Sequence, residues 1–236
     1  MARIALETGR GVVKESAREE ILARLRQAPK MEIPARPVMP TPREALFDRD
    51  GLIARFTEEL TRESGVVYRA ADREEILDYL TEIARAESLT RIMMSTDDMI
   101  RSLDLPAWGE RQGVSVSTAA DYPDRESYTR AVFDETDAGV TGADFAVAET
   151  GTLVIAHGGN QPRLVSLAPV LHVAVVGIDR LVPIYEDALS VFYGGAGRIP
   201  PAHLTLVTGP SMTADIRATA FKGMHGPRRV IVILAG

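Results

Sequence analysis

The chain has 236 residues, of which 45% are apolar, so it can bury one substantial core within a single main domain. Acidic residues outnumber basic ones, 33 to 27, and the formal charge of −6 disfavours binding to the phosphate backbone of a nucleic acid. Cysteine is absent, which excludes a disulfide framework, a thiol nucleophile and an iron–sulfur cluster held by thiolates of this chain.

The N-terminal segment predicts a helical arm followed by a linker. Residues 1–10 contain no apolar run of signal-peptide length, and no stretch reaches the ~20 apolar residues that span a bilayer, so we expect a cytoplasmic protein without a membrane span. Ser16 and Glu19 form a capping-box pattern at the start of an amphipathic helix over 14–28. Five prolines within residues 29–42 then predict an extended linker. The predicted organisation is an arm and linker over 1–45 and one α/β domain over 46–236.

Helices and strands alternate from residue 50 onward. A helical stripe runs from Asp50 to Gly65, which suits a C-terminal cap, and a strand follows over 66–69. Asp72 and Glu75 begin a second helix, which leads to a strand over 91–95. Such alternation predicts an α/β fold with an open, mostly parallel sheet flanked by helices. Further strands are predicted at 114–117, around 147, and at 153–156, 171–176, 204–207 and 230–234, with helices over 126–136 and after Pro183.

The segment from about Gly139 to Pro227 is rich in glycine and poor in charge, so its few charged residues are the candidates for chemistry. Glu149 stands before Thr150, Gly151 and Thr152 at the mouth of an apolar strand. Gly151 permits a tight turn, and the threonine hydroxyls can orient the acid or a ligand. Glu149 is therefore a candidate general base or covalent nucleophile; a surface hairpin is the alternative.

A second candidate is the loop that contains Gly158, Gly159, Asn160 and Arg163. Adjacent glycines let backbone N–H groups approach a bound anion, and an arginine can hold a carboxylate or phosphate through two hydrogen bonds. The loop matches no well-defined phosphate-binding pattern, and a simple flexible loop is the alternative.

A third candidate is the turn that contains Thr208, Gly209, Ser211, Thr213 and Asp215. Its pattern predicts a strand, a turn and then the N-terminus of a helix, where free amides and hydroxyls favour an anion. The alternative is that Ser211 or Thr213 only caps that helix.

Histidines add one weak candidate. His225 lies between glycines in a predicted loop, whereas His172 lies inside an apolar strand and is expected to be a core residue. No pair of histidines has the spacing of a catalytic zinc site, so we expect no metal. Taken together, the loops after residues 149, 158 and 208 are expected to meet at one rim of the sheet and bind a small carboxylate or phosphate.

Several of these stretches together resemble the lactate-utilisation protein C family, which carries the LUD domain. The resemblance rests on residues 139–152, Gly159-Asn160, Arg163-Leu164, residues 208–216 and residues 223–227. It implies a fold similar to that of sugar-phosphate isomerases and CoA-transferases, and a role in a three-part bacterial system that oxidises L-lactate to pyruvate. It also implies that Glu149 is the counterpart of the nucleophilic glutamate of the related transferases.

Three functions follow from these observations. The first is a subunit without a cluster in an iron–sulfur complex that oxidises L-lactate; the clusters are then expected on partner subunits, because this chain has no cysteine. The second is an independent enzyme of the acyl-transferase, CoA-transferase or sugar-phosphate isomerase kind that uses Glu149. The third is a regulatory module that senses a metabolite. The sequence leaves a homo-oligomer open.

Overall fold

The computed structural model describes residues 10–29, 47–194, 201–214 and 220–236. The chain divides into two units, Met1–Thr41 and Pro42–Gly236. Helix α1 (Arg10–Gln27) belongs to the first unit and exposes the side chains of Ile21 and Leu25. It begins before Ser16, so the predicted capping residue lies within the helix. Among the described helices, none combines the length and the apolar character needed to cross a membrane.

A six-stranded sheet forms the centre of the second unit, and every neighbouring pair in it is parallel. This confirms the predicted α/β fold with an open sheet flanked by helices. The strand order is β1 (Val66–Ala70), β12 (Arg229–Ala235), β7 (Leu171–Gly177), β4 (Ala138–Gly142), β2 (Arg91–Met94) and β3 (Ser115–Ser117).

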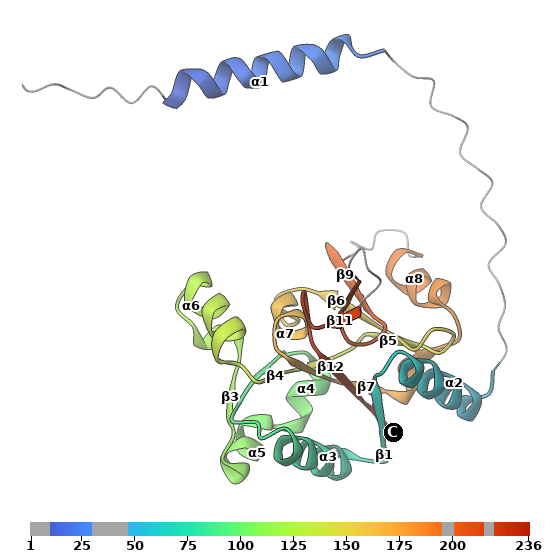
Figure 1. Ribbon diagram of the computed structural model, residues 1–236. Helices are drawn as coiled ribbons and strands as arrows, with labels where there is room; N and C mark the ends of the chain where they lie inside the picture. Colours follow the sequence, from blue (N-terminus) through green and yellow to red (C-terminus); the bar gives the residue numbers. More distant parts are fainter. Residues whose placement is uncertain (1–9, 30–46, 195–200, 215–219) are drawn as a thin grey trace, which may run out of the picture. The chain divides into compact units, whose positions relative to one another are not determined.

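Three helices cover one face of this sheet (Figure 1). They are α3 (Arg73–Ala86), α4 (Asp98–Leu103) and α5 (Leu105–Gln112). The Asp72 carboxylate accepts a hydrogen bond from the Glu75 N–H at 3.0 Å, which confirms the predicted start of α3. Leu80, Ile100 and Trp108 bring the three helices into one core with the sheet. Neither α4 nor α5 was predicted, because each is short and carries few apolar residues.

The second face packs against a helix and a smaller sheet. Helix α2 (Arg49–Arg62) places Phe56 and Leu60 in a core with Ile155, Val176 and Val232. Ser64, with φ of 69°, takes the left-handed conformation after α2, where Gly65 was expected to do so. The smaller sheet has the order β8 (Leu181–Val182), β5 (Phe145–Val147), β6 (Thr152–His157) and β9 (His203–Val207).

The remaining elements lie around these layers. Phe192 of α8 (Tyr185–Tyr193) contacts Phe145 of the smaller sheet edge to face, with ring centroids 5.5 Å apart. A π-helical turn, Ala131–Glu135, continues α6 (Arg125–Arg130) and places Val132 in a small core with Met93 and Val165. These elements are α6 (Arg125–Arg130), α7 (Arg163–Leu167), α8 (Tyr185–Tyr193), β10 (Met212–Ala214) and β11 (Ala220–Lys222), with single 3-10 turns at Ala119–Asp121 and Ile178–Arg180.

Helix α7 approaches β4 so closely that only glycine fits between them. A Cβ atom on Gly139 would lie 1.8 Å from the Val165 carbonyl oxygen, far inside van der Waals contact. The absence of a side chain at Gly139 therefore sets the distance between α7 and the sheet.

Replacing Gly139 with alanine should lower the free energy of unfolding by about 1–3 kcal/mol, because the methyl group forces α7 away from β4. Urea denaturation of both proteins measures the difference. Gly159→Ala is the matched control, since a Cβ atom there has no heavy atom within 4 Å, and it should change stability by less than about 0.5 kcal/mol. Equal stabilities of the two variants would contradict the close approach.

His172 is fully buried in β7, as predicted for a core residue. Its Nε2 atom lies 2.9 Å from the Thr141 hydroxyl of β4, whereas its Nδ1 atom has no hydrogen-bond partner within the described part of the chain. Burial, together with a smaller contribution from the charge of His157, lowers the pKa of His172 to about 4. The ring is therefore neutral in the folded protein near pH 7.

Because the pKa of His172 is lower in the folded than in the unfolded chain, protons favour unfolding as the pH falls. The free energy of unfolding should drop by up to about 3 kcal/mol between pH 6.5, the ordinary histidine value, and about pH 4. Chemical denaturation across this range measures the loss. His172→Gln keeps a polar atom near Thr141 but cannot titrate, so its stability should fall less steeply; identical pH profiles would exclude His172 as the cause.

Candidate functional site

Two of the three predicted loops meet at one end of the smaller sheet. The antiparallel register pairs Leu153 of β6 with Val207 of β9, which brings Thr208 beside Thr152. The hydroxyl of Thr152 lies 2.7 Å from that of Thr150 and 2.9 Å from that of Thr208. The structure thus places the turn after Glu149 and the turn after β9 side by side, with three hydroxyls in a chain.

Glycines in these two turns allow close contact with the end of α2. Gly151 has φ of 63°, and a Cβ atom on it would lie 2.3 Å from the Leu60 backbone nitrogen. Gly209 has φ of 146°, and its Cβ atom would lie 2.8 Å from the Glu63 carbonyl oxygen. Packing alone accounts for both glycines. Glu149 is partly exposed beside them, and its backbone N–H donates to the Pro183 carbonyl at 3.0 Å.

The third loop lies at the opposite end of β6. Gly158, Gly159 and Asn160 directly follow the six residues of that strand, whereas the Glu149 turn precedes it. At ~3.3 Å per residue, the two ends of β6 are roughly 17–20 Å apart. This corrects the expectation that the loops after residues 149, 158 and 208 share one rim and one anion. Arg163, at the start of α7, is exposed on the side of the third loop.

The segment after Thr208 is not a helix. Residues 212–214 form β10, which pairs with β11 in an antiparallel hairpin, so Thr213 lies in a strand. Ser211 is held by backbone hydrogen bonds, from its N–H to the Pro227 carbonyl and from the Gly223 N–H to its own carbonyl, each 2.8 Å long. The predicted helix N-terminus is therefore corrected to a hairpin. Asp215 lies outside the described residues.

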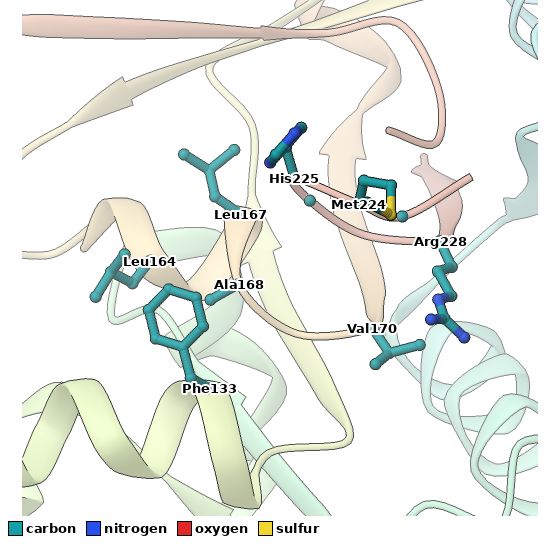
Figure 2. A pocket seen from close by; sticks show the side chains of 10 residues that line it. Phe133, Leu164, Leu167, Ala168, Val170, Met224, His225 and Arg228 are labelled. Carbon is teal, nitrogen blue, oxygen red and sulfur yellow. The ribbon is translucent and has the colours of Figure 1, made fainter. Parts of the chain in front are cut away.

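His225 lines a separate cavity of about 440 Å³ (Figure 2). Met224 and Arg228 line it from the same segment, and Phe133 and Leu167 line it from other elements. Phe133 and Met224 are both largely exposed, and none of the described residues that line the cavity carries a carboxylate. Within the described part of the chain, His225 therefore has no acid beside it in this cavity with which it could form a catalytic pair.

Sequence reasoning missed a cavity of about 490 Å³ at the carboxyl ends of the parallel strands. From β2, the next strand in the chain, β3, is added on one side and forms an edge of the sheet. The later strands β4, β7 and β12 are added one after another on the other side of β2. The direction in which strands are added therefore reverses between β2 and β4. Ligands of open parallel sheets bind at such a reversal. The residues that line this carboxyl-edge cavity are Asp97, Asp98, Met99, Ser102, Ala143, Asp144, Asn160, Gln161, Gly177, Asp179 and Arg180.

Three carboxylates in the cavity follow directly from strand ends. Asp97 comes after β2, Asp144 after β4 and Asp179 after β7. Two glycines make room for them: a Cβ atom on Gly142 would lie 2.2 Å from Asp97 Oδ1, and one on Gly177 would lie 2.2 Å from Asp179 Oδ1. The ends of β4 and β7 are thus shaped around acidic side chains.

Asp97 is the most firmly held of the three. Its carboxylate accepts hydrogen bonds from the Ser95 hydroxyl at 2.6 Å, the Gly142 N–H at 3.1 Å and the Ile100 N–H at 3.3 Å. The last of these caps α4, so one side chain joins β2, β4 and a helix. Such a carboxylate has a fixed orientation toward the cavity.

Asp144 has a raised pKa. Burial raises its pKa and the charge of Asp97 raises it further, while the Ala156 N–H, which donates at 2.7 Å, acts in the opposite direction. Carboxyl groups in a cavity with a raised pKa are frequent at sites of acid–base chemistry. The described residues contain no group of three or more histidine, aspartate or glutamate side chains placed to hold a metal ion.

A short loop lines the cavity with Asn160 and Gln161. The Thr96 N–H donates to the Asn160 carbonyl at 2.8 Å, and His157 Nδ1 lies 3.1 Å from the Gln161 carbonyl. His157 Nε2 in turn lies 2.6 Å from the Thr205 hydroxyl of β9. Burial lowers the pKa of His157, and the charges of Arg163 and His203 lower it further, so a neutral ring ties the loop to the smaller sheet.

Replacing Asp144 with asparagine should stabilise the protein near pH 7. The raised pKa means that the folded state disfavours the charged form of Asp144. The charged carboxylate therefore lowers the free energy of unfolding at neutral pH, and this loss vanishes once the pH falls below the ordinary aspartate pKa. The gain in the free energy of unfolding should therefore shrink as the pH is lowered, which chemical denaturation measures. Asp179→Asn, whose side chain is 71% exposed, is the charge-matched control and should gain less. A variant less stable than the wild type at pH 7 would contradict this electrostatic account.

Comparison with known proteins identifies the family. The LUD domain model matches residues 53–235. Lactate utilization protein C of Deinococcus radiodurans is 30% identical over 178 residues, which cover 72% of this chain and 80% of that protein. Lactate utilization protein C 1 of Bacillus mycoides is 29% identical over 164 residues, 69% of this chain and 70% of that protein. The crystal structure of a DUF162 family protein from D. radiodurans superposes with a TM-score of 0.53 at 23% identity, covering 81% of this chain and all of that one, which confirms the fold. The chain belongs to the LUD domain family.

Proposed function

We propose that this chain takes part in bacterial L-lactate utilisation, as the subunit without a cluster in an iron–sulfur complex that oxidises L-lactate to pyruvate. The observation that carries the proposal is the match to relatives named lactate utilization protein C, one of which is 30% identical over four fifths of its length. A second relative, lactate utilization protein C 1 of B. mycoides, supports it, because it matches this chain over a similar number of residues.

The absence of cysteine is consistent with a complex in which other subunits carry the redox groups. Oxidation of lactate removes two electrons, which need an acceptor, and a chain without cysteine cannot bind an iron–sulfur cluster through thiolates. We therefore assign the clusters to partner subunits. Within the complex this chain supplies polar and acidic groups at the carboxyl ends of its strands.

One observation favours a second candidate, an independent enzyme that uses Glu149 in acyl transfer, CoA transfer or isomerisation. The Glu149 turn and the Thr208 turn lie side by side. The Thr152 hydroxyl is 2.7 Å from the Thr150 hydroxyl and 2.9 Å from the Thr208 hydroxyl. A glutamate in a turn that also carries a row of hydroxyls suits nucleophilic or acid–base catalysis. The small carboxylate or phosphate that was predicted as a ligand would then bind at this end of β6.

Deletion of the gene should abolish growth on L-lactate and leave growth on pyruvate unchanged, because only the oxidation step is lost. The affinity-tagged chain should also copurify with proteins that contain iron and acid-labile sulfide. Growth yields on the two carbon sources and metal analysis of the purified complex are the measurements. Normal growth on L-lactate after deletion, together with no cluster protein in the purification, would overturn the proposal.

Complementation with Glu149→Gln separates the two candidates. A cluster-free subunit should tolerate this nearly isosteric change, so the variant should restore growth as the wild type does. Loss of complementation by a variant that still folds and copurifies with its partners would favour the Glu149 enzyme instead. Glu58→Gln, an exposed residue of α2, is the matched control and should complement in either case.

A further inference from the structure

A buried amide in the carboxyl-edge cavity has no hydrogen-bond partner among the residues that the structure describes. Gln161 is only 7% exposed and lines the cavity. Its backbone groups bond to Gly158 and His157, but its side-chain amide makes no hydrogen bond with any residue that the structure describes. Neither the oxygen nor the nitrogen of this amide is fully enclosed, so both keep some accessible surface. A buried amide of this kind is stabilised when a bound group pairs with it.

The charges around the cavity disfavour an anion. Among the described residues that line it, four are aspartates, Asp97, Asp98, Asp144 and Asp179, and one is basic, Arg180. The Arg180 Nε atom lies 3.6 Å from Asp179 Oδ2, so its charge is already partly balanced. Lactate, pyruvate or a phosphate would bring a further negative charge into this field. The predicted anionic ligand therefore does not suit this cavity.

The hydrogen-bonding groups in the cavity are of mixed kind. The Gln161 and Asn160 amides each present donors and an acceptor, Arg180 presents donors, and the carboxylates present acceptors. An ammonium ion has donors only and would leave the amide and guanidinium N–H groups unpaired. A hydroxyl group both donates and accepts, so several hydroxyls on one molecule match the whole set.

We propose that the carboxyl-edge cavity binds an uncharged, hydroxyl-rich small molecule of the sugar or polyol class, held by the Gln161 amide on one side and by the Asp97 and Asp144 carboxyl groups on the other. The cavity volume of about 490 Å³ lies in the range of small-molecule sites, roughly 300–1,000 Å³. The fixed orientation of Asp97, set by three hydrogen bonds, and the space that Gly142 leaves for it prepare the acceptor side in advance.

This inference goes beyond a role in lactate utilisation, because it concerns a ligand other than lactate. Its test uses the purified chain and no growth assay, so either proposal can fail while the other stands.

Saturation-transfer NMR with the full chain tests the ligand class directly. The probes are D-ribose, D-glucose, myo-inositol and glycerol as neutral polyols, and L-lactate and D-ribose 5-phosphate as anions. At least one neutral polyol should bind with a Kd in the millimolar range or below, and both anions should bind more weakly than that polyol. Binding of none of the four polyols, or stronger binding of either anion, would overturn the proposal.

Variants of the cavity locate the binding. Gln161→Met keeps the side-chain length but removes the amide, and should weaken polyol binding about tenfold, as expected for the loss of about 1.4 kcal/mol. Gln112→Met makes the same change at an exposed position at the end of α5 and should leave the affinity unaltered. Asp144→Asn, which is expected to fold stably, serves if Gln161→Met fails to fold, and should weaken the polyol and strengthen L-lactate relative to the wild type. Polyol affinity unchanged in the folded cavity variant would place the binding elsewhere and overturn the assignment.

Discussion

The position of the Asp97 carboxylate constrains the whole carboxyl edge of the main sheet. It accepts hydrogen bonds from the end of β2, the end of β4 and the first turn of α4. A buried or half-buried carboxylate needs such partners, because desolvation without compensation is costly. The partners also fix how the chain leaves β2 and β4, and residues that follow these strands line the cavity. The stability of this edge and the shape of the cavity therefore depend on the same set of contacts.

The smaller sheet connects this edge with the opposite turn. Strand β6 begins at the threonine cluster and ends at the loop that lines the cavity. The Ala156 N–H donates to Asp144, and His157 holds Gln161 through the loop backbone and Thr205 through its other ring nitrogen. The two candidate regions thus share one rigid strand although they do not share a cavity. The Glu149 turn and the Gly158 loop are close in sequence and therefore suggest one site, but the length of β6 separates them in space.

The sequence predicts the parts of the fold in which side-chain chemistry and burial agree. Strands β7 and β12 are continuous apolar runs because both of their faces are covered, and α3 shows its cap and its apolar stripe. Strand β4 escaped prediction because Gly139 must admit the Val165 carbonyl and Gly142 must admit Asp97, so few apolar residues remain. Without β4 the reversal of strand order could not be recognised, and Asp97, Asp144 and Asp179 could not be placed together. Ser211 and Thr213 resembled a helix cap because the pairing of β10 with β11 is not visible in local sequence.

The position of β12 has a consequence for how the protein is made. This strand is the last of the six in chain order, yet it lies inside the sheet, between the edge strand β1 and β7. While β12 is still within the ribosome, β1 has no neighbour in the sheet, and β7 exposes an apolar edge. Completion of the sheet must therefore follow synthesis of residues 229–235, and the long sequence separation between β1 and β12 favours slow folding. Until then the exposed edge of β7 can pair with other chains and aggregate. Cellular chaperones are the general means of protecting such an edge.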